Sequence, residues 1–285
     1  MIIKDLIYYG QETLKSNNIE DYVSDTKVLL MYLLKMSYSD LIVNINKEVT
    51  AAQYDEFKSY IDLRLKRIPC QYITGFQNFM GYEFHTHPNV LIPRPETEIL
   101  VENAIQCMKD FDSCKALDMC CGTGCIGIGF ALERKNSQKM DDTYVLADIS
   151  LDAINTSKCN GEKHNICVNV IQSDLFSEID DKFDIIMSNP PYICSEEVDK
   201  LMPEVKDHEP RLALDGDFDG LKFYRLIINQ APKYLNDGGV MIFEIGYDQG
   251  ESVSNILRDN GFIDIEVIKD YAGLDRVVIS KYEDK

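Results

Sequence analysis

The chain has 285 residues, of which 45% are hydrophobic, so it can build the core of one large domain or two modest ones. Its 29 basic and 48 acidic side chains give a net charge of −19. Phosphate backbones are bound mainly through positive charge, so this balance argues against direct binding to nucleic acid. No apolar run reaches the length of a membrane span, and the N-terminus lacks the pattern of an export signal. We therefore expect a cytoplasmic protein whose nine cysteines are reduced thiols.

The first 80 residues are predicted to be helical. Residues 50–53 have the spacing of a capping box, and apolar residues recur at intervals of three and four up to residue 68. Pro69 is expected to end this helix, because proline cannot continue it. Ser24-Asp25 precedes the apolar stretch 28–36 and predicts the start of another helix.

Charge is unevenly distributed along the chain. Residues 1–80 have 9 basic and 10 acidic side chains, a net charge of −1, whereas the remaining 205 residues have 20 and 38, a net charge of −18. This asymmetry favours two units with different partners. Between them, residues 79–86 alternate apolar and polar side chains around Gly81, which predicts a short strand or hairpin.

From about residue 115, short apolar strands alternate with helical stretches. The predicted strands are 115–119, 143–148, 168–172, 183–188, 239–245, 263–268 and 276–280. Such alternation predicts an α/β fold with a mostly parallel sheet, and ligands bind at the carboxyl ends of the strands in such sheets.

A glycine-containing loop follows the first of these strands. Residues 120–124 read Cys-Cys-Gly-Thr-Gly and lead into a predicted helix at 125–132. Glycines let the backbone approach a ligand, and a helix N-terminus offers free N–H groups. Asp148 ends the next strand, where a carboxylate can accept hydrogen bonds from both ribose hydroxyls of a nucleoside cofactor. The loop lacks the glycine pattern of dinucleotide sites, which favours a cofactor without a pyrophosphate. A plain turn with a solvated aspartate is the alternative.

A second motif, Asn189-Pro190-Pro191-Tyr192, directly follows the strand 183–188. Neither proline supplies an N–H, so a rigid loop with spare carbonyl groups is expected. The Asn189 side-chain oxygen and the Pro190 carbonyl can both accept hydrogen bonds from one NH₂ group, and Tyr192 offers a flat face for stacking on a planar amide or base. An ordinary strand-capping turn is the alternative interpretation.

This motif resembles that of class I S-adenosylmethionine methyltransferases acting on planar NH₂ nitrogens. Four further stretches, at residues 67–75, 90–98, 207–216 and 243–250, narrow the resemblance to the peptide chain release factor N5-glutamine methyltransferases, the HemK/PrmC family. The resemblance implies a seven-stranded Rossmann-like domain after a small helical bundle. It also implies methyl transfer from S-adenosylmethionine to the glutamine of a Gly-Gly-Gln motif in release factors.

Carried over by position, the resemblance assigns roles to individual residues. Cofactor contacts are expected from Cys120, Cys121, Gly122, Thr123, Gly124, Asp148, Leu175 and Asn189. Catalysis is assigned to Asn189, Pro190 and Tyr192, and Pro191 completes the substrate loop. Family members often have glycine where Cys120 stands. Cysteine adopts positive φ less readily, so we expect ordinary torsion at Cys120 and regard Gly122 and Gly124 as the stronger cofactor contacts.

The expected organisation is an N-terminal substrate-docking domain (1–78), a hairpin linker (79–90) and a methyltransferase domain (91–285). Residues 1–80 contain neither motif, so we assign them to docking of the protein substrate. No cysteine or histidine spacing indicates a metal site. A nucleic-acid N6-adenine or N2-guanine methyltransferase is the main alternative, since the same loop can hold a flipped base. An inactive cofactor-binding scaffold is a third reading, which the intact motif at residues 189–192 argues against.

Overall fold

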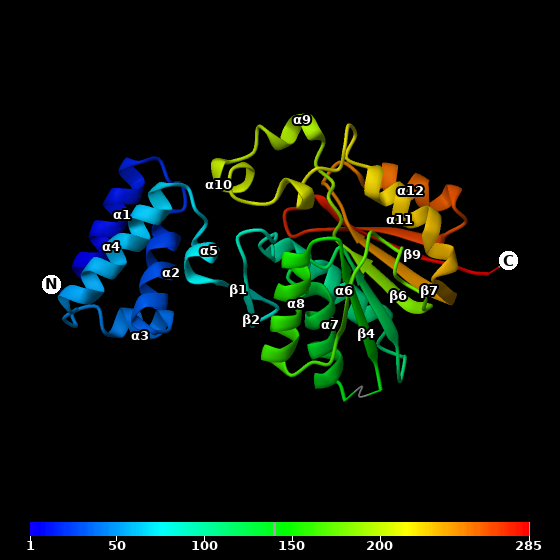
Figure 1. The fold of residues 1–285 in the computed structure, drawn as a ribbon, viewed down its shortest axis with the longest axis horizontal. Coiled ribbons are helices and arrows are strands. Elements are labelled where there is room, and N and C mark those ends of the chain that lie inside the picture. The colour runs from blue at the N-terminus through cyan, green and yellow to red at the C-terminus, as the bar shows by residue number, and fades with distance from the viewer. Residues whose placement is uncertain (139–140, 285) are drawn as a thin grey trace. The chain divides into compact units, whose positions relative to one another are not determined.

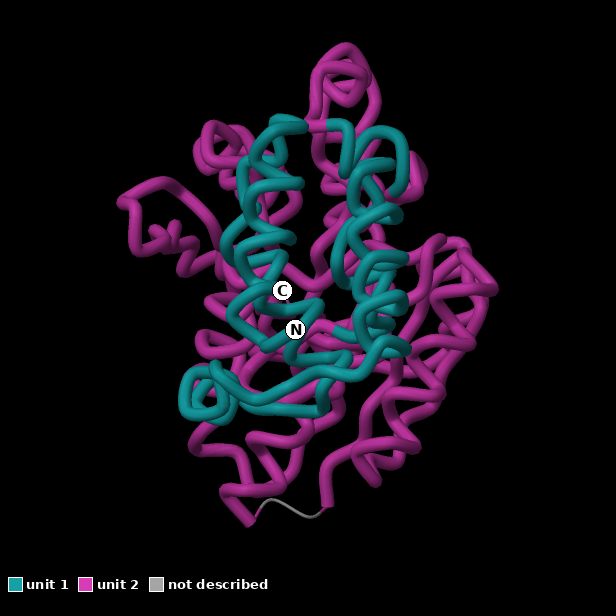
Figure 2. The backbone as a smooth tube through the Cα atoms, turned by 90° about the vertical axis from the view of Figure 1, so that its left-hand side faces the viewer, with its two compact units in different colours: residues 1–76, 203–208 teal, residues 77–202, 209–285 magenta. Residues whose placement is uncertain are grey.

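The computed structural model describes residues 1–138 and 141–284. The chain forms two compact units (Figure 2). Unit 1 comprises residues 1–76 together with 203–208, and unit 2 comprises residues 77–202 and 209–285, of which 139, 140 and 285 lie outside the described residues. The expected domain of residues 91–285 therefore ends at a residue that is not described.

Unit 1 is helical. Its helices are α1 (Ile3–Ser16), α2 (Tyr22–Leu34), α3 (Tyr38–Val43), α4 (Ala51–Leu65), α5 (Cys70–Thr74) and α10 (Pro203–Lys206). The capping box at the start of α4 is confirmed, because the Thr50 hydroxyl accepts from Gln53 N at 3.1 Å and the Gln53 side chain accepts from Thr50 N at 2.9 Å. Apolar side chains of α1, α2 and α4 form one core, which includes Leu6, Leu29 and Phe57.

Two helix boundaries predicted in unit 1, one start and one end, are wrong. Helix α2 starts at Tyr22, and Ser24 lies within its first turn, where its hydroxyl donates to the Asp21 carbonyl. Helix α4 already ends at Leu65, because Arg67 adopts a left-handed conformation with φ of 66°. Pro69 is instead the N-cap residue of α5. Proline disfavours helical torsion in the residue before it, which agrees with the absence of helix directly before Pro69.

Unit 2 is built around a seven-stranded sheet with strand order β5-β4-β3-β6-β7-β9-β8. Its strands are β3 (Lys115–Met119), β4 (Thr143–Asp148), β5 (Asn169–Gln172), β6 (Phe183–Ser188), β7 (Leu235–Glu244), β8 (Ile263–Lys269) and β9 (Asp275–Lys281). The pairs from β5 to β7 are parallel, and β9 runs antiparallel to both of its neighbours. The α/β class, the seven strands and the mostly parallel arrangement are thus confirmed.

A hairpin lies ahead of the sheet. Strands β1 (Phe76–Phe79) and β2 (Tyr82–His85) are joined by Met80 and Gly81, which both have positive φ, as tight hairpin turns require. Of the short strand or hairpin predicted within residues 79–86, the structure has the hairpin, and its first strand begins at Phe76.

Helices cover both faces of the sheet (Figure 1). One face packs against α6 (Glu98–Cys107) and α7 (Cys125–Asn136), and α8 (Leu151–His164) adjoins α7. The other face packs against α11 (Lys222–Gln230) and α12 (Gly250–Asp259). Consecutive residues of β3 alternate between the two cores, since Ala116 belongs to the first and Leu117 to the second. Shorter elements are η1 (Pro95–Thr97), α9 (Ser195–Val198), η2 (Arg211–Ala213) and η3 (Ala231–Lys233).

Within the described residues, no helix is both long enough and apolar enough to cross a membrane.

Candidate active site

A cavity of about 200 Å³ lies in unit 2 at the carboxyl ends of the parallel strands. It is lined mainly by the segments that follow β3, β4, β5 and β6 and by two more distant segments. These are residues 119–123, 147–150, 173–175, Asn189 with Pro191, residues 89–94 and residues around 210–213. Parallel strands bring their carboxyl ends to one edge of the sheet, so motifs far apart in the sequence share this cavity.

The loop after β3 is fixed by backbone hydrogen bonds. Cys121 N donates to the Ala147 carbonyl at 3.0 Å, and Gly124 N donates to the Cys121 carbonyl at 2.7 Å. Gly122 has a φ of 54°, and a Cβ built on it would meet only Val90 at 3.8 Å, so the backbone here is open toward the cavity. Gly124 faces the protein interior, where a Cβ would lie 2.9 Å from Ile128, Leu146 and Ser157. Its small size therefore serves packing beneath the loop.

The expectation for Cys120 is wrong. This residue lines the cavity and has a φ of 61°, in the left-handed region that glycine adopts most cheaply. The loop closes sharply between the end of β3 and the start of α7, so the backbone path requires this torsion whichever side chain is present. Burial raises the pKa of the thiols of Cys120, Cys121 and Cys125, which keeps them protonated.

Asp148 anchors the glycine loop to the end of β4. One of its carboxylate oxygens accepts from Gly122 N and the other from Ser150 N, each at 2.9 Å. Burial raises the pKa of Asp148, and the backbone N–H groups oppose that rise. Behind the same loop lies Asp118, which is fully buried and accepts from Gly127 N at 2.8 Å. Burial raises the pKa of Asp118 to about 7.

Leu175 lines the cavity beyond the end of β5, in a left-handed conformation with φ of 49°. The Ser173 hydroxyl donates to the Leu175 carbonyl at 2.6 Å, and Ser173 N donates to the Asp148 carbonyl at 2.9 Å. These bonds tie the segment after β5 to the end of β4.

The loop after β6 is positioned by side chains from other segments. Asn189 and Pro191 line the cavity, whereas Pro190 and Tyr192 are outside its lining. The Asn189 amide nitrogen donates to the Thr97 hydroxyl at 3.4 Å. The Tyr192 hydroxyl donates to Glu244 at 3.3 Å, and Gln249 donates to the Tyr192 carbonyl at 3.0 Å. Burial raises the pKa of the Tyr192 phenol, so the hydroxyl remains a donor.

Several residues of this region had no assigned role in the sequence. Thr97 and Glu244 lie in the family-like stretches 90–98 and 243–250, and Glu209 lies in 207–216. The Arg94 guanidinium pairs with the Glu209 carboxylate at 2.5 Å, which connects the two distant segments of the cavity wall. His208 lies outside the cavity lining, and its ring contacts the Lys66 carbonyl at 3.0 Å within unit 1.

The fold and the place of this cavity are those of the class I methyltransferases. A family model described as the PrmC N-terminal domain matches residues 5–75, and one described as the methyltransferase small domain matches residues 82–218. The chain is 42% identical to the release factor glutamine methyltransferase of Clostridium acetobutylicum, over 98% of each chain. It is also 42% identical to the protein of the same name from Clostridium botulinum, again over 98% of each chain.

Among solved structures, a 16S rRNA methyltransferase from T. thermophilus in complex with AdoMet and guanosine has the same fold. It is 18% identical with a TM-score of 0.52, over 73% of this chain and 50% of that one. On the sequence relationships, the chain belongs to the release factor glutamine methyltransferase family.

Proposed function

We propose that the protein transfers a methyl group from S-adenosylmethionine to the side-chain nitrogen, N5, of the glutamine in the Gly-Gly-Gln motif of peptide chain release factors. The observation that carries this proposal is the single cavity shared by the glycine loop with Asp148 and by Asn189. A methyl donor at one end and a planar amide at the other would then meet between them. The names of the relatives at 42% identity support the same substrate.

The cavity residues fit the proposed cofactor. Gly122 has no side chain to obstruct the backbone where it faces the cavity, and Asp148 offers a carboxylate at the end of β4. Leu175 is proposed to contact the adenine, and residues 120–123 with Asn189 to contact the rest of the molecule. When bound, S-adenosylmethionine supplies an electrophilic methyl group on a sulfonium sulfur.

The loop of residues 189–192 is proposed to orient the acceptor nitrogen. An amide nitrogen is a weak nucleophile, because its lone pair is delocalised into the carbonyl group. The Asn189 side-chain oxygen and the Pro190 carbonyl would accept its two N–H groups and direct the lone pair toward the methyl carbon, and Pro191 shapes the wall. Because Pro190 and Tyr192 lie outside the cavity lining, their contacts, including stacking of Tyr192 on the amide, require the bound glutamine to extend beyond that lining. Such positioning can contribute about 7–11 kcal/mol in favourable cases. The nitrogen loses its proton after the new N–C bond has formed.

Unit 1 is proposed to dock the release factor. It contains no residue of the cavity lining, so it contributes nothing to the chemistry directly. A protein substrate presents far more surface than one glutamine, and remote contacts can be used to orient the reacting group.

All nine cysteines are free thiols, which supports the proposed cytoplasmic location.

The decisive experiment uses the full-length protein with tritiated S-adenosylmethionine and unmethylated release factor. Label should enter the release factor, be released as methylamine on acid hydrolysis, and be absent when the Gly-Gly-Gln glutamine is changed to Ala. A parallel reaction with RNA and DNA tests methylation of adenine N6 or guanine N2. Label in a nucleobase, with none in the release factor, would replace the proposal by this alternative.

Docking by unit 1 can be tested with a chain that starts at residue 77. This chain should carry Glu204→Gln, because Glu204 otherwise loses its partners Arg64 and Arg67. We expect unchanged cofactor binding, a steep loss of activity on whole release factor, and a much smaller loss on a short Gly-Gly-Gln peptide. An equal loss on both acceptors in a folded protein would instead assign unit 1 to completing the active site. Equal retention would make unit 1 dispensable for recognition.

A further inference from the structure

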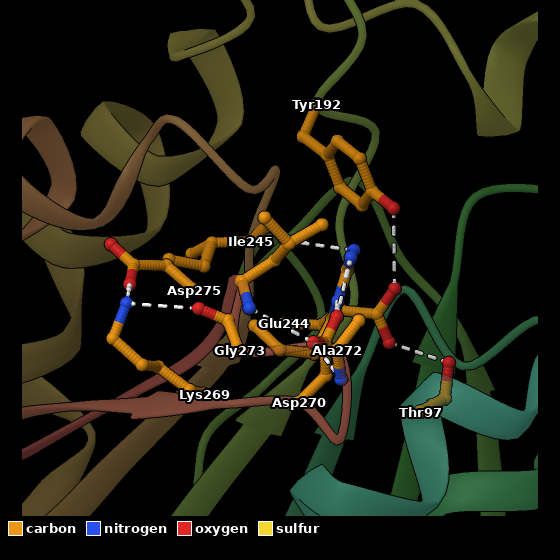
Figure 3. Close-up of polar contacts among 11 residues, drawn as sticks. Thr97, Tyr192, Glu244, Ile245, Lys269, Asp270, Ala272, Gly273 and Asp275 are labelled. Atoms are coloured by element: carbon orange, nitrogen blue, oxygen red, sulfur yellow. Dashed lines mark hydrogen bonds and ion pairs between the residues drawn. The ribbon is translucent and has the colours of Figure 1, made fainter.

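Four polar side chains from distant parts of the chain form a connected network at the cavity wall, which Asn189 and Thr97 line. The Asn189 amide nitrogen donates to the Thr97 hydroxyl at 3.4 Å, and that hydroxyl donates to a Glu244 oxygen at 2.5 Å. The second Glu244 oxygen accepts from the Tyr192 hydroxyl at 3.3 Å. Figure 3 shows Thr97 and Tyr192 each reaching a different oxygen of Glu244.

The chemistry of these groups fixes the direction of each hydrogen bond. An ionised carboxylate only accepts, and a hydroxyl has one proton to donate. Because Thr97 donates its proton to Glu244, its oxygen can only accept from Asn189. The Asn189 amide must therefore turn its NH₂ toward Thr97 and leave its oxygen for another donor. Thr97 and Glu244 are each 2% exposed, so water cannot readily replace either partner.

We propose that Thr97 and Glu244 are positioning residues that set which way the Asn189 side-chain amide faces. This inference rests on the proposed function, in which Asn189 accepts a hydrogen bond from the substrate amide. With the opposite orientation, Asn189 would present an NH₂ group to the NH₂ group of the substrate, and two donors repel. The network thus selects an acceptor over a donor at the point where the substrate nitrogen binds.

The burial of Glu244 argues for a role beyond packing. A carboxylate deep in a protein loses its hydration, and an apolar side chain or an amide would avoid that cost. Burial raises the pKa of Glu244, while the Thr97 hydroxyl, the Arg276 guanidinium and the Tyr192 hydroxyl oppose the rise. Each Glu244 oxygen accepts one hydroxyl proton, from Thr97 and from Tyr192. In its ionised form the carboxylate cannot donate, so Thr97 must act as an acceptor toward Asn189.

The test compares three variants of the full-length protein. Thr97→Val keeps the shape and removes the hydroxyl, Thr97→Ser keeps the hydroxyl, and Glu244→Gln introduces a donor. We expect Thr97→Val and Glu244→Gln to lower kcat on release factor by about 10- to 100-fold, somewhat less than the loss of a direct contact. The KM for release factor and the cofactor Kd should stay within about two-fold, and Thr97→Ser should stay within about three-fold of wild type in kcat.

A matched control is Thr156→Val in α8, a buried threonine outside the cavity whose hydroxyl donates to the Asp152 carbonyl. This variant should leave kcat unchanged. Normal kcat in Thr97→Val would overturn the proposal, as would an equal loss in Thr97→Ser and Thr97→Val, which would indicate packing alone. Should Glu244→Gln fail to fold, the two Thr97 variants still decide the matter.

A second measurement does not depend on the reaction. The side-chain NH₂ signals of Asn189 can be assigned by NMR from their loss in Asn189→Ala. They should shift in Thr97→Val and remain near their wild-type position in Thr97→Ser. If this pattern is seen but no release factor is methylated, the network stands and the proposed function fails. If the signals do not shift in Thr97→Val, the network itself is wrong.

Discussion

The two ends of the cavity are built in different ways. At the cofactor end, the loop of residues 120–124 is held by backbone N–H groups that donate to Ala147, Cys121 and Asp148, and three of its five residues have positive φ. At the other end, Asn189 is held by side-chain hydrogen bonds. Asn189 bonds to Thr97, 92 positions away in the sequence, and Thr97 bonds to Glu244, 147 positions away. Backbone shape therefore specifies the first end and side-chain chemistry the second. Substitutions should affect cofactor affinity or stability at the first and the rate at the second.

The contrast predicts its largest effect, a fall in kcat, when the Asn189 side chain is removed. In Asn189→Ala we expect kcat for glutamine methylation to fall by about 100- to 1000-fold, the range seen when a preorganised polar contact is removed. Cofactor affinity, measured by titration calorimetry, should stay close to wild type, because Asn189 is only one of the proposed cofactor contacts and the loop of residues 120–124 with Asp148 is untouched. Normal turnover by this variant would break the comparison.

Asp148→Ala should have a smaller effect of the opposite kind. Gly122 N and Ser150 N would both lose their acceptor, and the proposed ribose contact would be lost with them. Hydrogen bonds to a charged group are worth about 1.5–3 kcal/mol, so we expect cofactor Kd to rise by roughly 10- to 100-fold. At saturating cofactor, kcat should be nearly that of wild type. Unchanged affinity would remove the proposed ribose role.

The pH dependence of stability should identify Asp118 as a buried acid beneath the cofactor loop. Its pKa is about 7 in the folded chain, against an ordinary value of 3.8. Between these values the folded chain keeps a proton that the unfolded chain releases. The contribution of Asp118 to stability is therefore full below about pH 4 and is lost as the pH rises toward 7.

Urea unfolding of wild type and Asp118→Asn at several pH values measures this contribution. The stability of the variant relative to wild type should increase as the pH rises from about 4 to about 7. Other buried acids, Asp148 and Glu244 among them, titrate in both proteins and largely cancel in the difference. If the difference in unfolding free energy between the two proteins does not vary with pH, burial does not raise the pKa of Asp118.

The smallest effect is expected at Cys120. Because its φ is 61°, Cys120→Gly should relieve backbone strain and change the free energy of unfolding by no more than about 1 kcal/mol, on the stabilising side or near zero. The neighbouring Cys121→Gly is the matched control. Cys121 is buried without positive φ, so its loss should destabilise by about 1–3 kcal/mol. Similar destabilisation by both variants would contradict a strained torsion at Cys120.

The same contrast explains what could be predicted from the sequence. Strands β3, β4 and β6 were predicted with the bounds that the structure has, because a buried strand that runs into a turn leaves a local pattern. Strand β7 begins four residues earlier than expected, at Leu235, since Asn236, Asp237 and Gly238 look like a turn and yet lie within the strand. The torsion at Cys120 was predicted wrongly. The prediction relied on the preference of cysteine for negative φ, whereas the closure of the loop determines the torsion in the structure.

The substrate end was predicted only in part. Asn189 and its neighbours form a contiguous motif, so their grouping was visible in the sequence. The contact of Thr97 with Glu244 joins the start of α6 to the end of β7, and no short pattern encodes a pairing over that separation. Helical periodicity likewise gave no indication that residues 203–208 belong to unit 1.

The presence of residues 203–208 in unit 1 affects how the chain folds during synthesis. Arg64 is buried in unit 1 and pairs with Asp25 at 2.7 Å and with Glu204 at 2.9 Å. Asp25 and Arg64 leave the ribosome long before Glu204, so the nascent N-terminal helices must wait for some 140 further residues before this guanidinium gains its second carboxylate. Chains that stop before residue 204 would lack both ion pairs that Glu204 makes, with Arg64 and Arg67, so the N-terminal unit would be completed late in translation although it is made first.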